Sequence, residues 1–93
     1  MHPRPRACVR VRAWGRVQAV GFRAWLGGRA RQRGLDGWLR NLPDGSLEAV
    51  LAGPGDAVSA MVDQIRLGPP GARVDDVEVS DEPGDPAPGF RIS

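Results

Sequence analysis

The chain has 93 residues, a length that supports one small hydrophobic core and leaves no room for two. Its hydrophobic fraction of 41% and charged fraction of 26% are typical of a soluble globular protein, and no apolar run is long enough to span a membrane or form a signal peptide. Cys8 is the single cysteine, which excludes a disulfide framework. We therefore expect a cytoplasmic monomer with one domain over residues 7–93 and a frayed tail over residues 1–6.

The first half of the domain reads as a strand followed by a helix. Alternation over residues 7–14 predicts a half-buried strand, with Ala7 and Val11 on the face opposite Arg10 and Arg12. Residues 21–34 carry apolar side chains at helical spacing, and Gly34 is a natural end for that helix.

The second half begins with a hairpin of two strands, and a helix and a further strand follow it. Residues 35–41 and 47–51 read as two strands joined by a Pro-Asp-Gly turn. A helix capped by Asp56 follows and stops at Gly68. A strand over residues 74–79, with a bulge at Asp75-Asp76, comes next. A Pro/Gly loop then leads to a short edge strand over residues 90–92.

This order predicts an α+β fold, a ferredoxin-like βαββαβ sandwich. Its antiparallel sheet carries both helices on one face, and a short fifth strand follows at the C-terminus. Many unrelated functions use this fold, so function has to be inferred from a site.

The segment between the first strand and the first helix is the best candidate for a site. A loop over residues 15–21 can direct successive N–H groups at one anion, supported by the positive end of the helix dipole. Arg23 follows in the first helical turn, and its planar fork of donors suits phosphate oxygens. The net charge of +2, with most arginines before residue 41, also favours an anionic ligand.

Two spaced blocks of this sequence resemble the acylphosphatases, enzymes that hydrolyse the carboxyl-phosphate bond of acyl phosphates. The first block reads Gly15, Val17, Gln18, Ala19, Val20, Phe22, Arg23. The second reads Gly37-Trp38-Leu39-Arg40-Asn41, followed by Asp44-Gly45. Together with Phe90-Arg91-Ile92, they extend the resemblance over nearly the whole chain, and two blocks in the right order are far more specific than one glycine loop.

The resemblance implies a site and a mechanism. Arg23 and Asn41 correspond to the family's catalytic pair, with Arg23 on the phosphoryl group and Asn41 positioning the attacking water. The phosphate would be bound by Arg16, Val17, Gln18, Ala19, Val20 and Gly21, mainly through their main-chain N–H groups. The family needs no metal or cofactor, and this chain offers no His/Cys/carboxylate cluster for a transition metal. An acyl phosphate is the expected partner, and inorganic phosphate or sulfate would fit the same loop.

One residue departs from the family pattern, and Arg23 and Asn41 each have a simpler structural interpretation. Ala19 stands where the family usually has glycine, which predicts a strained loop or altered phosphate affinity. Outside the block, Arg23 would read as a solvated helix-surface arginine and Asn41 as a turn residue.

Two other functions also fit the predicted fold. An RNA-binding module would stack bases on Trp14 and Trp38, on the open face of the sheet. A non-catalytic domain of a larger enzyme would bind carbamoyl phosphate. Nucleic acid is disfavoured, because the chain lacks an aromatic-rich RNA-binding block.

Overall fold

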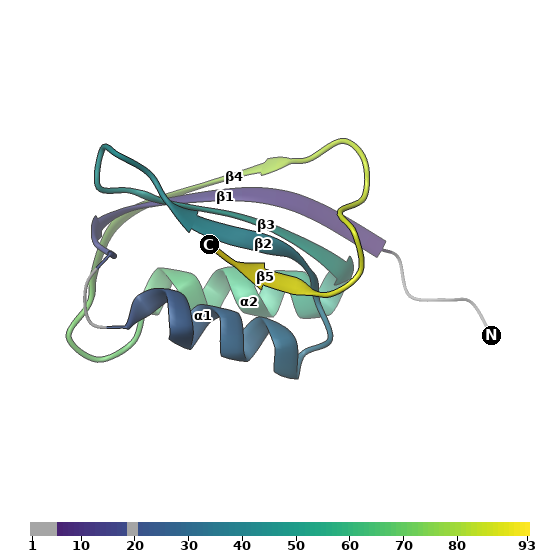
Figure 1. The fold of residues 1–93 in the computed structure, drawn as a ribbon, viewed down its shortest axis with the longest axis horizontal. Helices are drawn as coiled ribbons and strands as arrows, with labels where there is room; N and C mark the ends of the chain where they lie inside the picture. Colours follow the sequence, from purple (N-terminus) through teal and green to yellow (C-terminus); the bar gives the residue numbers. More distant parts are fainter. Residues whose placement is uncertain (1–5, 19–20) are drawn as a thin grey trace.

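The strands of the computed structural model, which describes residues 6–18 and 21–93, form one sheet in the order β4-β1-β3-β2-β5. They are β1 (Arg6–Arg16), β2 (Asp36–Asn41), β3 (Leu47–Pro54), β4 (Arg73–Asp81) and β5 (Phe90–Ile92). Helices α1 (Phe22–Gln32) and α2 (Gly55–Leu67) both lie on one face of this sheet (Figure 1). No helix of the described residues lies on the other face, as expected for the predicted sandwich.

The pairing of β5 adds one feature to the predicted topology. β1 pairs antiparallel with β3 and β4, and β2 pairs antiparallel with β3. β5 instead lies parallel to β2, with Gly37 opposite Phe90. The segment between β4 and β5 carries the chain from one edge of the sheet to the other, which makes parallel pairing possible (Figure 1). The ferredoxin-like fold is confirmed, but its sheet is mixed and not wholly antiparallel.

The core lies between the sheet and the two helices. The alternation predicted for β1 is confirmed, because Val11 and Ala13 are 2% and 1% exposed on the helix side. α1 and α2 bury one stripe each, and the largest fully buried side chains include Phe22, Leu26, Leu39, Leu51, Met61 and Ile65. This packing holds α1 although the helix contains two glycines, which favour the unfolded chain.

The ends of the elements follow the sequence signals with one correction. Gly34 and Gly68 follow the last residues of α1 and α2, as predicted. α2, however, is capped by Pro54 and begins at Gly55, so Asp56 is not its N-cap. Asp56 lies in the first turn of α2, where its negative charge still favours the helix dipole.

The predicted bulge in β4 is present and lies where β1 approaches the candidate loop. Trp14 pairs with Asp76 and Gly15 pairs with Val74, so Asp75 is the extra residue. β1 begins at Arg6, which places this residue of the expected tail in the sheet. Among the described residues, no helix is long and apolar enough to cross a membrane.

Candidate active site

The segment between β1 and α1 is anchored at both of its described ends. Val17 is fully buried in the core and Gly21 caps α1 in the left-handed conformation, with φ of 71°. The first main-chain hydrogen bond of the helix runs from the N–H of Trp25 to the carbonyl of Gly21, at 2.9 Å. Among the described residues, the N–H groups that precede Trp25 in α1 have no main-chain acceptor. The first turn holds no acidic side chain that would repel an anion.

Gln18 ties this segment to the β2–β3 hairpin. Its Nε2 donates hydrogen bonds to the main-chain carbonyls of Leu42, at 2.7 Å, and Ser46, at 3.0 Å. Leu42 follows directly after Asn41. The Gln18 side chain therefore braces the loop, and only its main-chain groups remain available for the phosphate contact predicted from the sequence.

Arg23 is linked to β2, the strand that carries Asn41, by way of Ser93. Its Nη1 donates a hydrogen bond to the main-chain oxygen of Ser93. The N–H of Ser93 in turn donates to the carbonyl of Leu39, at 3.0 Å, two residues before Asn41. The two residues predicted to act on the substrate are therefore tied to adjacent parts of β2.

Asn41 carries an unused acceptor. It is the last residue of β2, opposite Leu47, and its Oδ1 atom is buried without a hydrogen-bond partner among the described residues. A buried carbonyl oxygen left unpaired costs about 1–3 kcal/mol. A water or a ligand bound at this position would recover that cost.

The other predicted phosphate-binding residues differ in what they can offer. Arg16 is exposed at the end of β1, opposite Arg73. The side chain of Val17 is in the core, so only its main chain could meet a ligand. Ala19 and Val20 lie outside the described residues, and so does the expected effect of alanine at position 19.

Two supporting residues were not predicted as part of the site. Ser93 accepts the hydrogen bond from Arg23, and Leu42 accepts one from Gln18. Both use main-chain oxygens, which every residue type carries. Their side chains therefore give no sequence signal for these roles.

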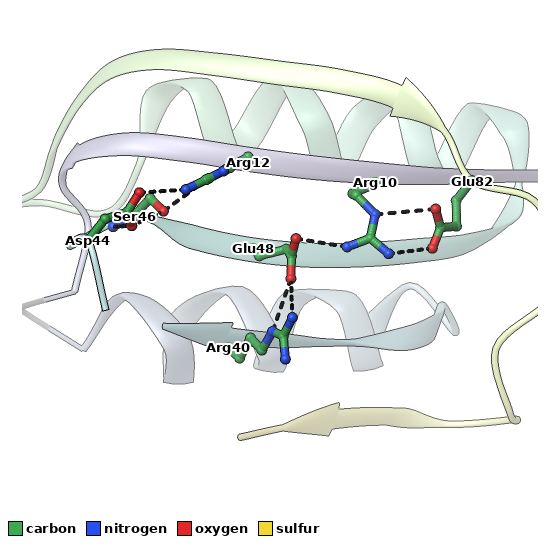
Figure 2. A network of polar contacts seen from close by, with 7 residues as sticks. All are labelled: Arg10, Arg12, Arg40, Asp44, Ser46, Glu48 and Glu82. Atoms are coloured by element: carbon green, nitrogen blue, oxygen red, sulfur yellow. Dashed lines mark hydrogen bonds and ion pairs between the residues drawn. The ribbon is translucent and has the colours of Figure 1, made fainter. Parts of the chain in front are cut away.

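The open face of the sheet carries a network of paired charges (Figure 2). Arg10 donates to Glu82 at 2.6 Å and to Glu48 at 2.7 Å, and Arg40 also binds Glu48, at 2.8 Å. In the same way, Arg12 binds Asp44. These guanidinium groups also lie over aromatic rings, with Arg10 and Arg40 at Trp38 and Arg12 at Trp14. Trp14 and Trp38, the two rings of the RNA-binding alternative, do share this face, but the arginines beside them are neutralised within the protein.

Glu48 is the centre of this network, and its pKa gives a testable pH dependence. Burial raises the pKa of Glu48, but hydrogen bonds from Arg40 and Arg10 outweigh burial and lower it overall. Stability from this lowered pKa is present above the ordinary glutamate range and is lost as pH falls through it. We expect Glu48→Gln to reduce the free energy of unfolding by about 1 kcal/mol at pH 7. Urea denaturation should show this difference shrinking as the pH falls below the ordinary glutamate range and Glu48 becomes protonated; a constant difference would contradict the assignment.

Gly15 controls where the candidate loop leaves the sheet. Its φ is 124°, and an added Cβ would lie far inside van der Waals contact with the main-chain oxygen of Arg73. We expect Gly15→Ala to lower the free energy of unfolding by about 2 kcal/mol or more. The matched control is Gly28→Ala in α1, where an added Cβ meets nothing within 4 Å. Urea denaturation should show the control slightly stabilised, by about 0.5–1 kcal/mol.

Neither a metal-binding cluster nor the hollow along α2 offers a better candidate for the active site. Across residues 6–18 and 21–93, no group of three or more His, Cys, Asp or Glu side chains is placed to hold a metal ion. A hollow of about 430 Å³ lies along α2, between Val58, Val62 and Val79. None of the residues predicted for the site lines it, so its size alone gives no reason to place the chemistry there.

Comparisons with known proteins agree with the fold. A family model named Acylphosphatase matches residues 9–92. An acylphosphatase from Rhizorhabdus wittichii is 51% identical, over 91% of this chain and 86% of its own length. One from Mesorhizobium japonicum is 52% identical, over 99% and 98% of the two chains. The structure of an acylphosphatase from Coxiella burnetii superposes with a TM-score of 0.89 and 31% identity, over 95% of this chain and 93% of that one.

Proposed function

Because the chain belongs to the acylphosphatase family and hydrolyses acyl phosphates, we propose how its residues divide the reaction. Arg23 and the N–H groups of residues 16–21 hold the phosphoryl group, and Asn41 orients the attacking water. One observation carries this proposal. The Oδ1 of Asn41 is buried without a partner among the described residues, and it lies on the strand to which Ser93 ties Arg23.

The phosphoryl group is bound by electrostatics alone. A guanidinium has five N–H donors, so Arg23 can keep its hydrogen bond to Ser93 and still present others to two phosphate oxygens. The N–H groups at the start of α1 add partial positive charge without a competing acidic side chain. Both features stabilise the charge that spreads over the equatorial oxygens during phosphoryl transfer.

The role of Asn41 is to position the attacking water. Its carboxamide oxygen accepts a hydrogen bond from water, which places the water oxygen in line with the bond to be broken. The water oxygen attacks phosphorus, the bond between phosphorus and the acyl oxygen breaks, and the carboxylate leaves. Asn41 has no useful pKa, so it cannot serve as the base. In this proposal, one proton of the water passes to a phosphoryl oxygen of the substrate.

The hydrolysis of benzoyl phosphate tests the function and its independence of metals. We propose that no metal takes part, because Arg23 and the main-chain N–H groups supply the charge that a metal ion would otherwise supply. We expect the protein to hydrolyse benzoyl phosphate at the same rate with and without a chelator. A rate lost with the chelator and restored by Mg²⁺ would show that a metal is needed, and no hydrolysis by folded protein would contradict the function.

Further properties follow from this site and from the sequence. Inorganic phosphate and sulfate should compete with the substrate, because they would bind to the same N–H groups. We also propose that Ala19 alters loop stability or phosphate affinity without abolishing activity. From composition alone, we propose a monomer that acts in the cytoplasm.

A further inference from the structure

Two side chains from outside the β2–β3 hairpin meet at Ser46, the residue that closes this hairpin. The Nε2 of Gln18 donates to the main-chain carbonyl of Ser46, and the Nε of Arg12 donates to its Oγ, at 3.1 Å. The same carbonyl accepts the N–H of Leu42, at 2.8 Å, and Leu42 directly follows Asn41. Ser46 is 1% exposed. A buried residue with polar contacts on both its main chain and its side chain therefore links Arg12 to the chain next to Asn41.

Asp44 closes a ring of contacts with Arg12 and Ser46 (Figure 2). Its Oδ1 accepts hydrogen bonds from the N–H of Ser46, at 2.9 Å, and from the Ser46 hydroxyl. Its Oδ2 accepts one from the Nη2 of Arg12. The hydrogen bonds from Ser46 and the charge of Arg12 lower the pKa of Asp44, so the carboxylate is ionised at neutral pH. Each of the three residues contacts the other two.

Stability gives this ring only a small role, whereas its place in the fold suggests a larger one. The side chains of Arg12 and Asp44 are 38% and 48% exposed, and ion pairs this exposed add little to folding. Asn41, however, is the last residue of β2 and pairs with Leu47 at the end of the β2–β3 ladder. Contacts that fix the turn beyond this last pair also fix the direction in which the Asn41 carboxamide points.

We propose that Arg12 and Asp44 are positioning residues for the hydrolysis, and that they act through the hairpin on Asn41. The inference rests on the proposed function, in which Asn41 orients the attacking water. Neither residue touches the substrate or that water. Opening the ring would free the turn, and a small displacement of a group that orients a reactant is enough to slow the reaction. Phosphate binding should not change, because Arg23 and the main-chain N–H groups provide it in this proposal.

Asp44→Asn opens the ring with almost no change of shape, because the new amide group cannot accept a hydrogen bond from Arg12 on both of its atoms. We expect kcat for benzoyl phosphate to fall by about ten-fold, with KM and the inhibition constant of phosphate near their wild-type values. Arg12→Gln opens the same ring from β1 and should give the same result. The matched control is Glu82→Gln, which breaks an ion pair of the same kind, with Arg10 at 2.6 Å on the same face of the sheet. It should keep the wild-type kcat.

A double variant shows whether the effect passes through Asn41. In the Asn41→Ala background, Asp44→Asn should cause no further loss of kcat, because the group that it positions is already gone. A ten-fold loss in both backgrounds would overturn the inference, since Asp44 would then act independently of Asn41. Equal losses in Asp44→Asn and Glu82→Gln would overturn it too, because the charge of the open face and not the hairpin would be responsible.

The same measurements separate this inference from the proposed function on which it rests. If Asn41→Ala loses turnover while Asp44→Asn and Arg12→Gln both keep the wild-type kcat, the positioning role alone is overturned. If the folded wild type does not hydrolyse benzoyl phosphate, or if Asn41→Ala keeps full turnover, the proposed function itself is contradicted.

Discussion

Replacement of Asn41 by alanine is expected to lower kcat for benzoyl phosphate by about 100- to 1000-fold. The inhibition constant of inorganic phosphate should stay near the wild-type value, because in our proposal Asn41 binds the water and not the phosphoryl group. The protein should also remain folded. The Oδ1 atom that the substitution removes is buried without a partner among the described residues, so the free energy of unfolding should change by less than about 1 kcal/mol.

Steady-state kinetics, phosphate inhibition and urea denaturation test these three statements together. Pro43→Ala is a suitable control, because Pro43 is exposed in the hairpin turn that follows Asn41. If the control lost as much turnover as Asn41→Ala, the hairpin and not the carboxamide would be responsible. If phosphate inhibition weakened in proportion to the loss of kcat, Asn41 would be a ligand of the phosphoryl group.

Much of the fold could be predicted because its signals are local. Alternation in β1 showed which side chains face the helices, and Gly34 and Gly68 marked where α1 and α2 end. The cap of α2 could not be predicted in the same way. Pro54 and Asp56 are both acceptable near a helix start, and the end of β3, which reaches Pro54, decides between them.

The parallel pairing of β5 has no local signal. A three-residue strand pairs in either direction, and its orientation is set by the path of the preceding loop. The loop from β4 is held near β2 by Asp36, which accepts a hydrogen bond from the N–H of Gly89 at 2.8 Å. That bond joins residues far apart in the sequence, and periodicity does not encode it.

In the candidate site, too, some features have local sequence signals and others depend on contacts between distant residues. The blocks around Arg23 and Asn41 predict two side chains for the site, but they do not predict what links these residues to each other. That link consists of hydrogen bonds to main-chain oxygens of Ser93 and Leu42, for which any residue type would serve. On the open face, the alternation that placed Arg10 and Arg12 together could not show that Glu48 and Glu82 neutralise Arg10.

Arg23→Ala is expected to have the largest effect of all, a loss of about 1000-fold or more in kcat/KM for benzoyl phosphate. Phosphate inhibition should weaken as well, by about ten-fold or more, because in our proposal the guanidinium binds the phosphate before and during the reaction. This joint loss distinguishes Arg23 from Asn41, whose substitution should spare phosphate binding. Steady-state kinetics and phosphate inhibition measure both quantities.

Two further variants show whether the geometry of Arg23 matters beyond its charge. Arg23→Lys keeps the charge and loses the planar fork, so it should recover part of the phosphate affinity but little of the turnover. Arg33→Ala removes the same charge from the other end of α1 and should leave both nearly unchanged. Equal losses in Arg23→Ala and Arg33→Ala would mean that the net charge attracts the substrate. Full recovery by lysine would mean that a point charge suffices and that the hydrogen bond to Ser93 does not orient the phosphoryl contact.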